Sequence, residues 1–187
     1  SPDLATWTPR PIPMLTSVSG ALLAVNGVAH LNGTWLLSGT LLLTSTDLTN
    51  WTSRTSYVGD LAQLNAAAAA TNSLVAVGAS GVIVRSGDGA NWTQPVSPTG
   101  NALNDVVHHN GLYVAAGASG TLLRSSDGNS WLTSPSGTTD GLNFVSRVCN
   151  EFVAGGAAGT MLRSTDGTTW ATVASGLAHV LNSIAVG

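Results

Sequence analysis

The heptapeptide SSDGNSW, at residues 125–131, is one of five segments of the chain that align without gaps. The other four are SPDLATW at 1–7, STDLTNW at 45–51, SGDGANW at 86–92 and STDGTTW at 164–170. The closing tryptophans of the five segments are separated by 44, 41, 39 and 39 positions. A motif that recurs at a nearly constant interval along a whole chain indicates a repeat architecture.

Three further elements keep register with the heptapeptide. A Leu-Asn pair begins 13, 11, 11 and 11 residues after the preceding tryptophan, at Leu64, Leu103, Leu142 and Leu181. A Gly-rich apolar stretch follows at 74–81, 112–120 and 152–159, and another apolar stretch runs into the serine of the next heptapeptide. Each repeat therefore holds about four short apolar stretches, and stretches of roughly 5–7 residues fit β-strands.

Four strands in a repeat of about 40 residues match one blade of a β-propeller. We therefore predict an all-β fold, a β-propeller-like array of four-stranded antiparallel blades with four to five repeats of 39–44 residues. We expect residues 1–187 to form a single repeat domain whose two ends fall within blades, with 181–187 as the first strand of a further blade. Ala66–Ala70 favours a helix by intrinsic propensity, but the repeat places this run on the first strand of a blade, so we predict a strand there.

The heptapeptide is expected to form the hairpin turn between the third and fourth strands. Its Asp carboxylate and Ser hydroxyl can accept hydrogen bonds from backbone N–H groups of the turn, and its Gly can adopt positive φ. Its Trp can cover the gap between neighbouring sheets. A residue that recurs in every blade is a scaffold residue, whereas a catalytic one would occur once. The residues assigned this structural role are Ser45, Asp47, Trp51, Ser86, Asp88, Trp92, Ser125, Asp127, Trp131, Ser164, Asp166 and Trp170.

The pattern resembles the Asp-box, also called the bacterial neuraminidase repeat. This repeat occurs in sialidases, sortilin-type receptors, some xyloglucan-cleaving glycosidases and photosystem II assembly-factor-like propellers. The resemblance implies a propeller whose boxes lie away from any active site, and it leaves the function open. The chain departs from the usual box because Gly follows Asp directly and Trp comes four residues after Asp. Leu4 and Leu48 also stand where the later boxes have Gly.

The composition excludes several classes of partner. Charged residues make up only 8% of the chain, all six basic residues are Arg, and the net charge is −3. A chain with no basic stripe is not expected to bind nucleic acid or anionic membranes, and no apolar run is long enough to span a bilayer. The abundance of Thr, Ser, Gly, Asn and Ala favours an extracellular or cell-surface location. The single cysteine, Cys149, excludes an internal disulfide and is expected to be a small core residue.

The candidate ligand-binding residues are polar residues outside the repeat consensus. Propeller sites use the connections between blades and the innermost strands, and both regions carry such residues here. The alternative is that they are solvated loop residues and polar residues lining the channel. The two adjacent histidines should point to opposite faces of their strand, so we expect no metal site and no cofactor. The candidates, for carbohydrate or protein, are Asp60, Asp105, His108, His109, Asp140 and Arg147.

Three functional hypotheses follow. The first is a non-catalytic module that binds carbohydrate or protein, and the second is a structural protein whose blades assemble between copies into a ring or fibre. The third is a fragment of a sialidase-like glycoside hydrolase whose catalytic residues lie outside this chain. A sialidase-like site would need three arginines on a carboxylate, and the candidates for them are Arg85, Arg124 and Arg163. These arginines lie beside the boxes and Glu151 is the only glutamate, so we predict that the chain is not an enzyme.

Overall fold

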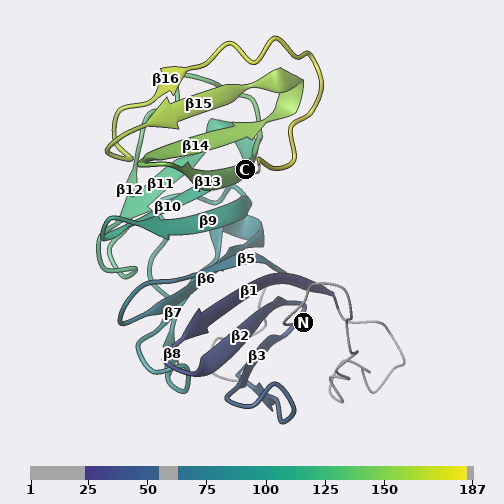
Figure 1. The fold of residues 1–187 in the computed structure, drawn as a ribbon, viewed down its shortest axis with the longest axis vertical. Helices are drawn as coiled ribbons and strands as arrows, with labels where there is room; N and C mark the ends of the chain where they lie inside the picture. The colour runs from purple at the N-terminus through teal and green to yellow at the C-terminus, as the bar shows by residue number, and fades with distance from the viewer. Residues whose placement is uncertain (1–23, 55–62, 185–187) are drawn as a thin grey trace.

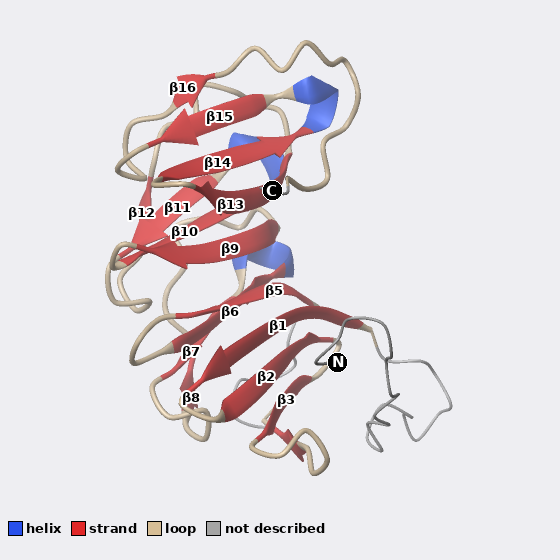
Figure 2. Cartoon of the chain, viewed as in Figure 1, coloured by secondary structure: helices blue, strands red, loops and turns tan. Residues whose placement is uncertain are grey.

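The computed structural model describes residues 24–54 and 63–184. These residues form four antiparallel sheets of four strands each. The sheets pack one after another in an arc, with their first strands next to one another (Figures 1 and 2). We number the sheets as blades 1 to 4. The predicted all-β array of four-stranded blades is confirmed, while the first heptapeptide, at 1–7, lies outside the described residues.

Blade 1 consists of β1 (Val25–Leu31), β2 (Thr34–Gly39), β3 (Leu42–Ser45) and β4 (Thr52–Ser53). Blade 2 consists of β5 (Leu64–Ala69), β6 (Leu74–Gly78), β7 (Ile83–Ser86) and β8 (Trp92–Thr93). Blade 3 consists of β9 (Leu103–His109), β10 (Leu112–Gly117), β11 (Leu122–Ser125) and β12 (Leu132–Thr133). Blade 4 consists of β13 (Leu142–Val148), β14 (Glu151–Gly156), β15 (Met161–Ser164) and β16 (Ala171–Thr172).

The alanine run forms a strand, as the repeat predicts. β5 alternates between buried and half-buried residues along its length, because one face packs on each neighbouring blade. Tertiary packing therefore overrides the helical propensity of alanine. The strand expected at 181–187 is not formed over residues 181–184, although the Leu181 N–H donates to the Gly156 carbonyl oxygen at 2.8 Å. Residues 185–187 lie outside the described part.

Tight turns join the first two strands of each blade. Asn110 and Gly111 both have positive φ, 49° and 75°, which is the conformation of the two-residue hairpin turns that suit twisted strands. Cys149 holds the position of Asn110 in blade 4, with φ 53°, and its side chain is exposed. The prediction of a buried core cysteine is therefore wrong, because β13 ends one residue before Cys149.

The hydrophobic core lies between the blades. Each apolar cluster combines one face of a blade with the facing side of the next blade, and the clusters of the first two seams include the box tryptophans Trp92 and Trp131. The first strands β1, β5, β9 and β13 stand side by side along the inner side of the array (Figure 1). Removal of apolar surface from water at these seams holds the blades together.

A ladder of asparagine side chains joins the inner strands. Each of these asparagines is the second residue of its Leu-Asn or Val-Asn pair, at a β-bulge where it has no partner on the second strand of its own blade. Its Nδ2 donates to a backbone carbonyl oxygen of the next repeat at 2.8–3.1 Å. The bulge turns the side chain away from its own sheet, toward the edge of the neighbouring strand. The donors Asn26, Asn65, Asn104 and Asn143 bind the carbonyls of Leu64, Leu103, Leu142 and Leu181.

Candidate binding site

The heptapeptide hairpins form closed networks of hydrogen bonds. In blade 2, Ser86 Oγ accepts from the N–H of Asp88 at 3.3 Å and of Gly89 at 2.8 Å, and it donates to Asp88 Oδ1. Asp88 Oδ1 accepts from the N–H groups of Ala90 and Asn91 at 2.8 and 2.7 Å. The bond from the Asn91 N–H is the main cause that lowers the pKa of the Asp88 carboxyl far below its ordinary value. The same network recurs around Asp47, Asp127 and Asp166, so these carboxylates serve the turns.

The glycine of each later box has two functions. Gly128 has φ 72°, and a Cβ added there would lie 2.8 Å from Cγ2 of Val75 in the preceding blade. The Trp131 indole N–H donates to the Gly128 carbonyl oxygen at 3.0 Å. The box of blade 1, at 45–51, carries Leu48 at this position with φ 59°, and the buried Nε1 of Trp51 has no partner within the described residues.

Two of the predicted aspartates bind backbone and hydroxyl groups of the scaffold. Asp105 accepts from the N–H of Val106 at 2.8 Å and from that of Val145, on the next inner strand, at 2.9 Å. Burial raises the pKa of the Asp105 carboxyl, and the two N–H donors partly oppose that rise. Asp140 accepts from Thr160 Oγ1 at 2.6 Å. Asp60 lies outside the described residues.

His108, His109 and Arg147 lie at the hairpin ends of β9 and β13. The His108 ring packs on Tyr113 in its own blade, with ring centroids 4.6 Å apart, whereas the His109 ring packs on Phe152 of blade 4 at 5.6 Å. The two imidazoles therefore point to opposite faces of β9, as predicted. Arg147 is the cross-strand partner of the same Phe152, so His109 and Arg147 both neighbour Phe152 at the seam between blades 3 and 4.

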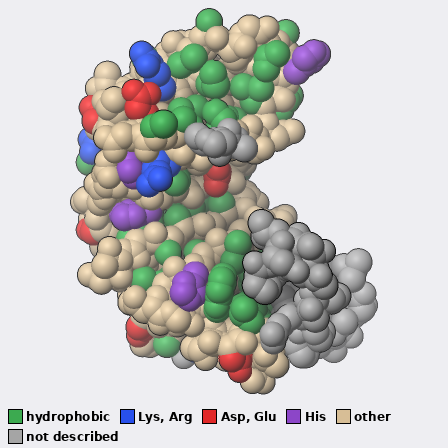
Figure 3. Space-filling view, in the orientation of Figure 1, with side chains coloured by type: hydrophobic (Ala, Val, Ile, Leu, Met, Phe, Trp, Pro, Cys, Tyr) green, Lys and Arg blue, Asp and Glu red, His purple; other side chains and the backbone are tan. Residues whose placement is uncertain are grey.

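Asn150 completes the group at this seam, which we call the hairpin patch and define as His109, Arg147 and Asn150, while His108 lies on the other face of β9. Asn150 Oδ1 accepts from Asn110 Nδ2 at 3.1 Å and lies 3.3 Å from His109 Nε2. Arg147 is exposed and has no ion pair within the described residues. Burial, and secondarily the charge of His109, lowers the pKa of His108. Histidine and arginine side chains form a column on this face, over the ends of β1, β9 and β13 (Figure 3).

The three repeated arginines lie on separate blades. Arg85 Nε donates to the Asp127 carbonyl oxygen of the next blade at 2.8 Å, and Arg163 lies 3.9 Å from Glu151. Tyr113 has its hydroxyl bonded to Ser73 in the preceding blade, at 2.9 Å. These contacts are structural and do not gather into an anion clamp.

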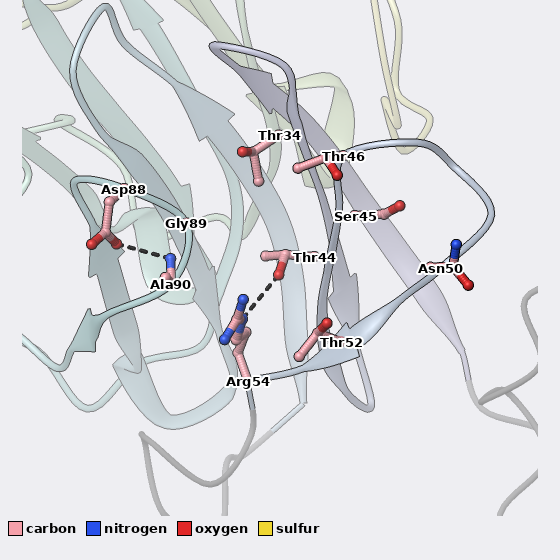
Figure 4. A pocket seen from close by; sticks show the side chains of 10 residues that line it. All are labelled: Thr34, Thr44, Ser45, Thr46, Asn50, Thr52, Arg54, Asp88, Gly89 and Ala90. Atoms are coloured by element: carbon pink, nitrogen blue, oxygen red, sulfur yellow. Dashed lines mark hydrogen bonds between the residues drawn. The ribbon is translucent and has the colours of Figure 1, made fainter.

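A pocket that the sequence analysis missed lies at the seam between blades 1 and 2. It has a volume of about 390 Å³ and is lined mainly by hydroxyl-bearing side chains of blade 1 and by the box hairpin of blade 2 (Figure 4). The signal for it is a break in the repeat, because Thr44 stands where the later blades carry Arg85, Arg124 and Arg163. Its lining residues are Thr34, Thr44, Ser45, Thr46, Asn50, Thr52, Arg54, Asp88, Gly89 and Ala90.

In residues 24–54 and 63–184, no three His, Cys, Asp or Glu side chains cluster in a way that could hold a metal ion. Over the same ranges, no helix is sufficiently long and apolar for a membrane crossing.

Comparison with known proteins identifies the fold. No protein-family model and no curated protein matches the sequence. Among solved structures, YCF48 from Cyanidioschyzon merolae is similar with a TM-score of 0.68 and 17% identity, over 90% of this chain and 59% of that chain. YCF48 bound to D1 peptide is similar with a TM-score of 0.57 and 18% identity, over 90% of this chain and 71% of that chain.

A third similar structure is the WD40 β-propeller domain of Doa1, with a TM-score of 0.63 and 15% identity, over 80% of this chain and 54% of that chain. The chain thus spans less than two thirds of the first YCF48 structure and of the Doa1 domain. At these identities the likeness concerns the fold alone. The chain is an array of β-propeller blades.

Proposed function

We propose that the chain is a non-catalytic module that binds an acidic segment of a partner protein at the hairpin patch. The observation that carries this proposal is Arg147, an exposed guanidinium without an ion pair in the described part of the chain, beside His109 and Asn150. A guanidinium binds a carboxylate through two parallel hydrogen bonds, and Asn150 offers amide groups for backbone contacts. The resolved complex of YCF48 with a peptide supports the choice of a protein ligand.

The remaining acidic groups support a non-catalytic function. Glycoside hydrolysis needs two carboxyl groups that face a shared substrate. Asp105 and Asp140 are hydrogen-bonded to the scaffold, and the box aspartates are bonded within their own turns. Carbohydrate recognition has less support, because the box tryptophans Trp92 and Trp131 are buried at blade seams. As part of this proposal we place the module outside the cell or at its surface, on composition alone.

A peptide-display selection on the immobilised chain tests the proposal. We expect enriched peptides to be rich in Asp and Glu, and we expect Arg147→Glu to lose their binding. Arg163→Glu makes the same charge change on the same blade, at an arginine that is ion-paired with Glu151, and should retain binding. Enrichment of uncharged peptides, or equal loss with both variants, would overturn the proposal.

Assembly between copies is a second candidate because of Val28. This residue is 57% exposed, whereas the equivalent residues Val106 and Val145 are buried against the preceding blade. Blades 3 and 4 each use this face to pack on the preceding blade. The equivalent face of blade 1 therefore carries an exposed apolar side chain. Light scattering over a dilution series tests this candidate: a multimer that Val28→Asp dissociates would support it, and a monomer at all concentrations would refute it.

A further inference from the structure

The pocket between blades 1 and 2 exists because one arginine of the repeat is replaced. Arg85 of β7 crosses the seam between blades 2 and 3 and donates to the Asp127 carbonyl of the next box at 2.8 Å. Thr44 has the same register position on β3, opposite Leu36 as Arg85 is opposite Val75. The threonine side chain lacks the length and the guanidinium of arginine, so the space that Arg85 fills in one seam stays open in the other.

The walls of this pocket hold hydrogen-bonding groups that the scaffold does not use. Within the described residues, the hydroxyls of Thr34, Thr46 and Thr52 line the pocket and make no hydrogen bond. The Ser45 hydroxyl and the Asp88 carboxylate, by contrast, are both bonded within their box turns. The open groups of the pocket are therefore mainly hydroxyls, which can each donate one hydrogen bond and accept others.

Arg54 supplies the one cationic group of the lining. Its Nε donates to Thr44 Oγ1 at 2.9 Å, and its two terminal nitrogens have no partner within the described residues. Figure 4 shows the Arg54 side chain directed into the space between Thr44 and the hairpin that carries Ala90. A guanidinium with a fixed Nε and two open N–H₂ groups is oriented to bind a planar carboxylate.

From this arrangement we infer that the pocket binds a small monocarboxylate that carries several hydroxyl groups. Arg54 binds the carboxylate, and the hydroxyls of Thr34, Thr46 and Thr52 bind the ligand hydroxyls. The volume of about 390 Å³ falls in the range of small-molecule sites. Asp88 lines the same pocket and stays ionised, so a second carboxylate on the ligand is repelled. This site is separate from the hairpin patch, and its occupancy does not depend on the proposed protein binding.

The test is an NMR titration of the isotope-labelled full chain with three related probes. D-gluconate has the carboxylate and the hydroxyls, glucitol has the hydroxyls without the charge, and hexanoate has the charge without the hydroxyls. We expect gluconate to shift the Arg54 Nε–H and the amides of Thr46 and Ala90 in a saturable manner. The other two probes should bind at least about tenfold more weakly, because each leaves wall groups unpaired.

Two variants and a control make the assignment specific. Thr44→Arg should fill the pocket as Arg85 does in the next seam and abolish gluconate binding, while Arg54→Gln should weaken it at least about tenfold. Arg163→Gln, an exposed arginine of blade 4, should bind gluconate as the unmodified chain does. Absence of saturable shifts, equal binding of glucitol, or unchanged binding by folded Arg54→Gln would each overturn the inference. If Thr44→Arg does not fold, Arg54→Gln still decides.

Discussion

Asn104 Nδ2 donates to the backbone carbonyl oxygen of Leu142 at 2.8 Å, and this bond ties the inner strand of blade 3 to that of blade 4. The two residues are 38 positions apart, and the same separation holds for every bond of the asparagine ladder. Inner strands have a free edge, and the ladder supplies donors to carbonyls on that edge. The spacing of the repeat and the stacking of the blades are therefore linked by one side-chain type.

Asn104→Ala should destabilise the fold because it removes a donor from a partly buried carbonyl. The expected loss is about 1–2 kcal/mol in the free energy of unfolding. Urea denaturation of the variant measures it. Asn101→Ala removes an exposed bond to Thr121 and should cost less than about 0.5 kcal/mol. Equal losses for the two variants would show that the ladder does not stabilise the seam.

Alanine substitutions at two glycines with positive φ distinguish the cost of backbone strain from the cost of steric overlap. Gly120 has φ 66°, and an added Cβ would overlap the Thr138 carbonyl oxygen, whereas Gly137 has φ 74° with no atom within 4 Å of that Cβ. Gly137→Ala should cost about 1–2 kcal/mol from strain alone. Gly120→Ala should cost roughly 3 kcal/mol or more, because overpacking adds to the strain. Thermal and urea denaturation check the difference, and a Gly137 variant that loses as much as the Gly120 variant would contradict the close approach of Gly120 to the Thr138 carbonyl.

Asp105 and Asp127 should titrate in opposite directions from the ordinary aspartate pKa. Burial raises the pKa of Asp105, whereas the N–H bonds from Ser130 and Asn129 lower that of Asp127. The contribution of Asp105 to stability is therefore complete below the unfolded-state pKa and is lost as pH rises through its raised folded-state pKa. The contribution of Asp127 is present above the unfolded-state pKa and is lost as pH falls toward its lowered folded-state value.

Carboxyl carbon chemical shifts, followed from acidic to neutral pH, measure both titrations directly. We expect the Asp105 midpoint above the ordinary aspartate value and the Asp127 midpoint below it. Coincident midpoints would contradict both the burial of Asp105 and the hydrogen bonds that Asp127 accepts.

Cys149 should react with a thiol reagent in the native state at a rate close to that of the unfolded chain. Its side chain is exposed in a two-residue turn, so no unfolding step limits access. Cys149→Gly should stabilise the fold by up to about 1 kcal/mol, since glycine adopts positive φ without strain. A thiol that reacts only after denaturation would place Cys149 in the core, as its sequence context first suggests.

The fold was predictable because the same strand and turn pattern recurs in each repeat. The heptapeptides end at tryptophans spaced by 39 residues in the last repeats, and this regularity also identified β5 as a strand despite its alanines. The role of Asp105 was not predictable, because its carboxylate and the Val145 N–H that donates to it come together only when two bulged inner strands stack. Cys149 was misplaced for a local reason, since the end of β13 depends on the hairpin turn.

The candidate site was predictable only in part. His108, His109 and Arg147 were singled out because they interrupt the repeat consensus, and the structure brings His109 and Arg147 to one seam around Phe152. The pocket beside Thr44 was missed because a Thr in place of Arg carries no sequence signal for a binding site. The replacement of Arg by Thr44 can be linked to a pocket only because the structure shows that Arg85 crosses the corresponding seam.

The most direct test of the proposed function is a titration of the labelled chain with a synthetic acidic peptide, followed by amide and side-chain chemical shifts. We expect saturable shifts at His109, Arg147 and Asn150, which are absent with a peptide whose Asp and Glu are replaced by Asn and Gln. They should also disappear in Arg147→Glu and persist in Arg163→Glu. Shifts that map elsewhere, or that are equal for the charged and uncharged peptides, would contradict the claim that this chain binds acidic protein segments at the hairpin patch.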